Sequence, residues 1–425
     1  MVAETALGVS RRRLYLARMT DCGSEAVTAA FRSVGLDAVV LPPPDAASLA
    51  LGSRYLSGDE CLPAKVTLGD YLKVVFGPGF DPRRSAFVMP TTEGPCRFGQ
   101  YAPAIRQILR ELGVPEVVVV SPTSGDGYDF GAYGPELQRT IWRAVVASDI
   151  LRKLLLKTRP YETDPGVSDA AYRRSLDELV ATLETPGLRT RAQLRALEAD
   201  LVRIRDRFRA IPARYDTGRL LIGIQGEIFC RMEEFCNDQL IRRLEAGGAE
   251  AWLADIAEWV WYCNVYQEDM LRQTGRRLSL AMLQARLRDR IQHADEAALR
   301  APFMEDFTGY EDPEPVREIL AAAESYLPHP GASGEMVLSA GTVDWFFRKG
   351  ADGIIDISPF SCMNGLVSEA LYPRQSQEHD GLPIRVFYFD GTARDLTLDL
   401  EIFLEMARDY QQRKPHPRRY PPWFA

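Results

Sequence analysis

Histidine, long apolar runs and paired cysteines are all scarce in this sequence, and each scarcity excludes a class of protein. Only four histidines occur among 425 residues, and none has a second ligand at helical spacing, so we expect no histidine-based zinc or iron site. The longest purely aliphatic run, Val117 to Val120, is far too short to span a membrane. The N-terminus has no apolar segment before a small-residue cleavage site, so we expect no secretory signal.

The charge balance argues against nucleic acid and membrane surfaces as partners. The formal net charge is −8, and a negative chain is repelled by phosphate groups and anionic lipids. Two basic segments, Arg11–Arg13 and the tail at 413–420, are expected to be solvated. The seven cysteines are odd in number and spread singly, so we expect a cytoplasmic protein whose thiols serve chemistry or metal binding rather than disulfides.

The first 125 residues alternate between predicted strands and predicted helices. The helices carry apolar residues three and four positions apart, and the strands are short and rich in valine. Alternation of this kind predicts a mostly parallel sheet. The predicted strands are Arg13–Met19, Asp37–Leu41, Ser85–Pro90 and Glu116–Ser121, and the predicted helices are Gly23–Gly35, Leu62–Val75 and Gln100–Leu112.

The rest of the chain divides into a helical region and a second α/β lobe. Residues 135–215 carry apolar residues at helical spacing. The first lobe is expected at 1–134, and the second at 216–425 with a helical insertion at about 250–330. Predicted strands of the second lobe are Arg219–Ile228, Glu335–Ser339, Gly353–Ser358 and Ile384–Phe389, and its predicted helices include Asp238–Ala246 and Leu398–Gln411. The sequence thus predicts an α/β fold of two lobes with helices inserted between and around them.

Three cysteines occupy similar local positions in loops rich in glycine and proline. Cys96 and Cys362 each follow a predicted strand. All three cysteines, Cys61 included, come just before a predicted helix. Ligands bind at the carboxyl edge of open α/β sheets, and helix N-termini stabilise anions such as thiolates. Free backbone N–H groups in such loops also bond to cluster sulfurs. The pattern indicates a shared iron–sulfur site, while a packing role for three small buried side chains stays open.

The other cysteines are first expected to be packing residues. Cys22 is the best additional candidate, because it also lies between a strand and a helix. Cys230 and Cys236 flank a predicted turn and could approach the same edge, whereas Cys263 is typical of helix packing. No C-x-x-C pair occurs, so the spacing is not that of a zinc site or a ferredoxin.

Four local strings resemble the 2-hydroxyacyl-CoA dehydratase and benzoyl-CoA reductase superfamily. The similarity is greatest to CoA enzyme activase-related proteins and to double-cubane cluster proteins, and it covers about Arg13 to Asp399. Its most specific parts are GPCRFGQY and the SPFxCMxG pattern. The strings are SGDECLPAKVTLGD, PTTEGPCRFGQY, GEIFCRMEEFCNDQLIRRLE and GIIDISPFSCMNGLVS.

The resemblance implies a fold, a cofactor and partners. It implies two flavodoxin- or Rossmann-like lobes and a [4Fe–4S] cluster between them, held by Cys61, Cys96 and Cys362 with one iron left open. It also implies a homo- or heterodimer with a similar chain, and a separate ATP-hydrolysing activase that carries its own cluster and delivers low-potential electrons for dehydration or reduction. No GxxxxGK[ST] loop occurs here, which agrees with ATP being used by a partner.

Two departures from the family keep other readings open. Many relatives have C-x-x-C where this chain has Cys61 and Ala64. A double-cubane [8Fe–9S] cluster takes six cysteines in the family, and it would need Cys22, Cys230 and Cys236 here. A non-catalytic subunit or electron relay, and a zinc- or thiol-based structural protein, are the remaining alternatives.

Two charged residues near the predicted edge are weak catalytic candidates. Glu227 follows a predicted strand and could be a proton donor, but an N-capping or surface carboxylate is the more ordinary role. Arg97 follows Cys96 and could neutralise negative charge on a cluster or substrate, or else be a solvated side chain. No residue identifies a pocket for coenzyme A, so the acyl-CoA substrate is implied by the resemblance alone.

Overall fold

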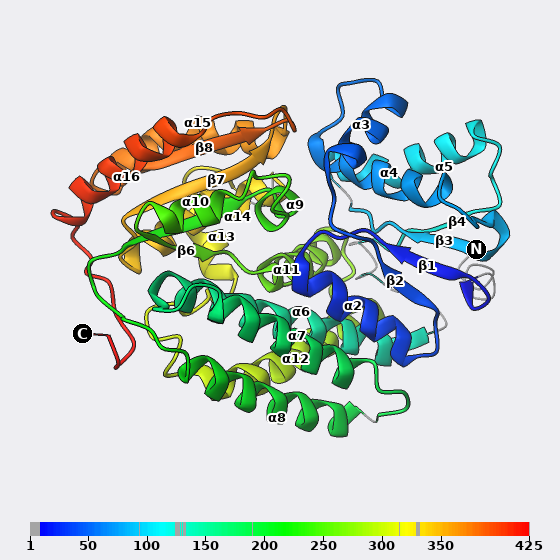
Figure 1. Cartoon of the computed structure of the whole chain (residues 1–425), viewed down its shortest axis with the longest axis horizontal. Helices are drawn as coiled ribbons and strands as arrows, with labels where there is room; N and C mark the ends of the chain where they lie inside the picture. Colours follow the sequence, from blue (N-terminus) through cyan, green and yellow to red (C-terminus); the bar gives the residue numbers. More distant parts are fainter. Residues whose placement is uncertain are drawn as a thin grey trace.

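Two α/β lobes stand on a layer of helices in the computed structural model (Figure 1). The structure describes residues 9–424 apart from 93, 124–127, 129, 131–132, 189, 314 and 329–331. Each lobe contains a four-stranded sheet whose strands are all parallel, in the orders β2-β1-β3-β4 and β6-β5-β7-β8. The two orders are the same 2-1-3-4 pattern, as in doubly wound folds. The predicted α/β class with two parallel sheets is confirmed.

The first lobe covers both faces of its sheet with helices. Alternate side chains point to opposite faces, so Phe87 of β3 packs toward α4 and α5, whereas Ala86 and Val88 pack toward α2. This two-sided burial is why the strands are apolar at nearly every position. The elements are β1 (Arg13–Leu16), α2 (Asp21–Ser33), β2 (Ala38–Val40), α3 (Ala46–Tyr55), α4 (Leu62–Val75), β3 (Ser85–Val88), η2 (Arg97–Gln100), α5 (Tyr101–Glu111) and β4 (Val118–Val120).

A layer of helices connects the two lobes. The long helix α6 (Gly134–Thr158) is buried over most of its length and contacts α2 of the first lobe and β6 of the second. It also packs against α7 (Val167–Leu183) and α8 (Thr190–Arg209). Figure 1 shows this layer beneath both lobes.

The second lobe repeats the topology of the first with longer connections. Its central strands, β5 and β7, are buried at every position. The elements are β5 (Leu220–Gly226), α9 (Ile228–Met232), α10 (Leu240–Ala246), β6 (Ala249–Leu253), α11 (Ile256–Gln273), α12 (Leu280–Arg300), α13 (Arg317–Ala323), α14 (Glu335–Arg348), β7 (Gly353–Pro359), α15 (Met363–Glu378), β8 (Ile384–Phe389) and α16 (Thr397–Gln411).

Three local predictions are wrong. Glu335–Ser339 is the first part of helix α14 and not a strand, because a short buried apolar run has no period that separates the two. The strand β6 lies partly in the segment from 250 that was predicted to be helical. The basic tail is not wholly solvated, since Arg418 is buried and forms an ion pair of 2.6 Å with Glu250.

No helix in the described ranges is long and apolar enough to cross a membrane. This finding agrees with the short apolar runs of the sequence. The helices instead bury one face or all faces within the two lobes and the layer beneath them.

Helix α4, whose first turn follows Cys61, crosses α3 at very short range. A methyl group at Gly69 would lie 1.8 Å from the carbonyl oxygen of Ser48, and one at Gly52 would lie 1.7 Å from that of Lys65. We therefore expect Gly69→Ala to destabilise the protein by about 1–3 kcal/mol through overpacking, measured by chemical denaturation. Ser53→Ala, on the exposed side of α3, should change stability by less than about 0.5 kcal/mol. A Gly69→Ala variant as stable as the wild type would contradict this crossing.

Candidate functional site

The three predicted cysteines each occupy the residue immediately before a helix. Cys61 precedes α4, Cys96 precedes η2 and then α5, and Cys362 precedes α15, and all three have an extended backbone. The loops of Cys96 and Cys362 follow β3 and β7, which hold the same place in the two sheets. Parallel sheets bind ligands at this carboxyl edge, beside the point where strand order reverses.

One arginine ties the three cysteine loops together. Arg97 donates through Nη1 to the carbonyl oxygen of Asp59 and to the hydroxyl of Ser361, the latter at 3.2 Å. Asp59 lies two residues before Cys61, and Ser361 lies one residue before Cys362. Loops that are 264 residues apart in sequence therefore meet at one guanidinium group. Cys61, Cys96 and Cys362 therefore lie near one another where these loops of the two lobes meet, which we call the cleft.

Tyr101 is a site residue that sequence reasoning missed. Its hydroxyl oxygen lies 2.7 Å from the sulfur of Cys61, although the two residues come from different helices. Burial raises the pKa of Tyr101 well above its ordinary value, and the neighbouring charges of Cys61 and Glu227 act in the same direction. Tyr101 is the last residue of the PTTEGPCRFGQY string, so the signal was present beside Cys96.

Backbone amides in the first turn of each helix face the sulfurs. The N–H of Phe98 donates to the sulfur of Cys96 at 3.5 Å. The amides of Ala64 and Gly365 act in the same way on Cys61 and Cys362, since each lowers the pKa of its cysteine. These donors favour the thiolate form of the side chain.

Burial nevertheless outweighs the amides, and the thiols of the metal-free chain hold their protons. Desolvation raises the pKa of Cys96 to about 12, and the charges of Glu335 and Glu227 push in the same direction. The pKa values of Cys61 and Cys362 are also raised, first by burial and then by Glu227. A positive group in the cleft would reverse this balance, because metal binding to thiols releases their protons.

Glu227 has the N-capping role that the sequence left open. Its carboxylate accepts hydrogen bonds from the amides of Phe229 at 3.1 Å and Cys230 at 2.8 Å, at the start of α9. The preceding Gly226 has a φ of 105°, and a side chain there would clash with the backbone of Ile357. Glu227 is thus held tightly at the end of β5, and burial raises its pKa.

Cys230 and Cys236 form a buried pair next to the site. Their side chains hydrogen-bond to each other, and after burial this bond is the main cause of the raised pKa of Cys230. Cys61 is among the charges that act on Cys230, and α9 contacts α4. Asn237 fixes the turn between them by donating to the carbonyl of Cys230 at 2.8 Å.

Cys22 and Cys263 lie in the helical layer instead. The sulfur of Cys22 lies 3.5 Å from the carbonyl oxygen of Ser148 in α6. Burial raises the pKa of Cys22, and Arg152 and Tyr172 act in the opposite direction. Burial likewise raises the pKa of Cys263, in α11. The main influences on these two thiols include no other cysteine.

Glu335 is a second residue that sequence reasoning missed. It begins α14, and its Oε1 accepts a hydrogen bond of 2.8 Å from the amide of Ile228. Burial raises the pKa of Glu335 to about 8, and the charge of Glu227 adds to this effect. The prediction of a strand at 335–339 hid its position at the start of a helix beside the cleft.

The possible donor set consists of three thiols from three separate loops. Within the described ranges, no group of three or more His, Cys, Asp or Glu side chains lies close enough to share one metal ion. A single zinc ion needs all its ligands within about 2.0–2.3 Å of one point. Buried thiols that arrive singly from three loops, each beside backbone amides, fit the thiolate ligation of an iron–sulfur group.

No model of a known protein family matches the chain, and no curated protein matches it. The convergence of the three cysteine loops and the buried carboxylates around them are the observations that bear on function.

We expect the stability of the iron-free chain to fall as the pH rises from about 5 to 9. The folded state keeps the proton of Glu335 up to about pH 8, whereas the unfolded chain releases it near 4.5, so the folded state loses stability between these values. Glu335→Gln should reduce this fall and raise the Tm at pH 9 by about 2–4 °C, measured by calorimetry. Glu401→Gln, at an exposed site on α16, should leave the pH profile unchanged. A Glu335→Gln profile identical to the wild type would contradict the assignment.

Proposed function

We propose that this chain is the iron–sulfur component of a 2-hydroxyacyl-CoA dehydratase-like enzyme. Cys61, Cys96 and Cys362 hold a [4Fe–4S] cluster that accepts low-potential electrons from a separate ATP-hydrolysing activase. The resemblance of the cysteine strings supplies the family, the partner and the dimeric assembly with a similar chain. The observation that carries the proposal is the meeting of the three cysteine loops at Arg97.

The chemistry of the cleft supports this proposal. A cluster with three thiolate ligands supplies an open iron that can act as a Lewis acid and one-electron donor. Cys61 and Cys362 are buried and Cys96 is half-buried, which limits the access of water and oxygen to the thiols. The first-turn amides of Ala64, Phe98 and Gly365 are placed to bond to ligand sulfurs and tune a reduction potential.

The residues around the thiols have separate roles in this proposal. Arg97 holds the loops in register and places a positive charge beside them. Tyr101 donates its hydroxyl proton toward the sulfur of Cys61. Glu227 uses its carboxylate for capping α9, so its main task is to position the loop between β5 and α9.

A double-cubane [8Fe–9S] cluster is the second candidate, and one observation favours it. Cys230 and Cys236 lie together beside Cys61, which would give five thiols around the cleft. Cys22 does not support a sixth ligand, because it lies against Ser148 in the helical layer. A role as a non-catalytic subunit or electron relay is compatible with either cluster.

Metal analysis after anaerobic purification tests the proposal. We expect a brown protein with about four iron atoms and four acid-labile sulfides per chain. The iron content per chain of the single variants should be lower than that of the wild type by about tenfold or more, because each variant removes a ligand. The variants are Cys61→Ser, Cys96→Ser and Cys362→Ser. Cys263→Ser is the matched control, since it changes a buried cysteine away from the cleft and should keep the iron. Zinc alone, or full iron in all three variants, would overturn the proposal.

The Cys230 and Cys236 pair distinguishes the two clusters. If the cluster is a single cubane, the Cys230→Ser/Cys236→Ser double variant should keep about four iron atoms per chain. For the double cubane, wild-type protein should hold about eight iron atoms and the double variant should lose about half or more of them. Iron and sulfide analysis with electron paramagnetic resonance measures both. Turnover with a cognate activase, ATP and a reductant then separates an enzyme from a relay.

A further inference from the structure

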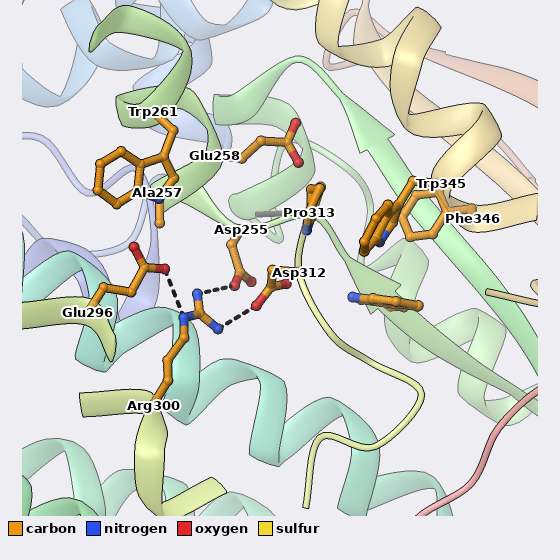
Figure 2. A pocket seen from close by; sticks show the side chains of 12 residues that line it. Asp255, Ala257, Glu258, Trp261, Glu296, Arg300, Asp312, Pro313, Trp345 and Phe346 are labelled. Carbon is orange, nitrogen blue, oxygen red and sulfur yellow. Dashed lines mark hydrogen bonds and ion pairs between the residues drawn. The ribbon is translucent and has the colours of Figure 1, made fainter. Parts of the chain in front are cut away.

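The interior of the second lobe contains two small cavities that share one carboxylate, Glu258. The first lies near the start of α11, and its aromatic side includes Trp252, Trp261 and Trp345. Figure 2 shows Arg300 bonded to Glu296, Asp255 and Asp312, with the carboxylate of Glu258 turned away from this group. The Arg300 contacts to Glu296 and Asp255 are 2.8 and 3.0 Å.

The second cavity is lined by both Glu258 and Glu335. It has a volume of about 10 Å³, the space of about one water molecule. Three of its side chains are at least nine-tenths buried and carry polar atoms without a hydrogen-bond partner, namely Gln225 Oε1, Arg231 Nε and Thr342 Oγ1. Small cavities lined by such atoms hold ordered water. The lining residues are Gln225, Gly226, Ile228, Arg231, Glu258, Glu335, Leu338, Ser339 and Thr342.

Arg231 is the cation that faces both carboxylates of the second cavity. It is anchored by donating to the carbonyl oxygens of Gly226 at 3.2 Å and Asp255 at 3.5 Å. Its charge lowers the pKa of Glu258 and of Glu335 against the effect of burial. In the described part of the chain Arg231 forms no ion pair with either glutamate, and its Nε has no hydrogen-bond partner, so the cavity has a place for a bridging water.

The two cavities connect a partly exposed residue to the cleft. Asp312, in the first cavity, has a side chain that is 20% exposed. Glu335, which lines the second, is bonded to the amide of Ile228, and its charge acts on Cys96 and Cys362. Titratable groups thus line both cavities, and Glu258 is common to the two.

We propose that Glu258 and Glu335, with water between them, form a proton route from solvent to the thiol cleft. The inference rests on the proposed function, since reduction or dehydration at the cleft requires protons. The carboxyl of Glu335 gives its proton to the hydroxyl oxygen that leaves the substrate, so one O–H bond breaks and one forms, and the water passes a proton on from Glu258. Glu258 is then protonated again by water in the first cavity, whose lining includes the partly exposed Asp312. No other bond is formed or broken, and no electron moves along this route.

The titration of these groups is consistent with such a route. Burial raises the pKa of Glu335 to about 8 and that of Glu258 to about 7, and carriers that titrate near neutrality can both accept and release protons. Glu335 is influenced by Glu227, Arg231 and Asp356. Glu258 is influenced by Arg231, Asp255, Asp312 and Lys153.

Rapid infrared spectroscopy of the purified full chain, before iron is added, tests the route. A protonated buried carboxyl that disappears in Glu335→Gln identifies Glu335, and its exchange after transfer into D2O measures access to solvent. Glu258→Gln should slow this exchange by about tenfold or more, because it removes the intermediate carrier. Glu268→Gln makes the same change on the same helix, at a residue paired with Arg272, and should leave the rate unchanged.

A second variant keeps the test decisive if Glu258→Gln does not fold. Thr342→Val removes an unpartnered hydroxyl of the cavity and keeps the shape of the side chain, so it should also slow exchange severalfold. Wild-type exchange rates in these variants, or no protonated carboxyl that depends on Glu335, would overturn the route. Iron content reports separately on the cluster, so failure of the route and failure of the proposed function are distinguishable.

Discussion

The arrangement of the cleft depends on one guanidinium group. Arg97, an exposed residue, bonds to the backbone before Cys61 and to the hydroxyl before Cys362 while it directly follows Cys96, so a single side chain joins the three loops. Arginine suits this task because its donors are fixed in a planar fork. Ser361, one of its partners, has a φ of 64°, a conformation that non-glycine residues adopt rarely. The loop of Cys362 is therefore also constrained by its own backbone.

The two lobes are topological repeats that use equivalent positions differently. Cys96 and Cys362 follow the same strand of the 2-1-3-4 order, whereas Cys22 and Cys230 follow the other central strand. In the first lobe this strand leads into α2, and Cys22 in the first turn of that helix packs against Ser148 of α6. In the second it leads into α9, and Cys230 in the first turn lies near Cys236 and Cys61. The surroundings of the two helix starts thus decide which of these cysteines lies near the site.

Several acidic groups lie at the cleft and along the cavities. Burial makes the charged forms of these groups unfavourable. The thiols, Glu227 and Glu335 all have raised pKa values with burial as the first cause. A protein retains such groups where a compensating charge or a proton transfer gives them a use. An inorganic cluster at the thiols and a proton route through Glu258 would supply these two uses, and they explain why acids gather on one side of Arg231.

The sequence by itself determined the two parallel sheets, the bounds of α4 at Leu62–Val75 and the positions of Cys61, Cys96 and Cys362 just before helices, because these features follow from local periodicity and turn residues. It could not determine that Glu335 begins a helix, since a short buried apolar run has no distinctive period. Only the tertiary structure decided that Arg97 joins the cysteine loops, that Cys22 lies elsewhere, and that Glu258 and Glu335 border one cavity. Such contacts join residues far apart in the chain, and no local pattern records which side chains the packing of two lobes will bring together.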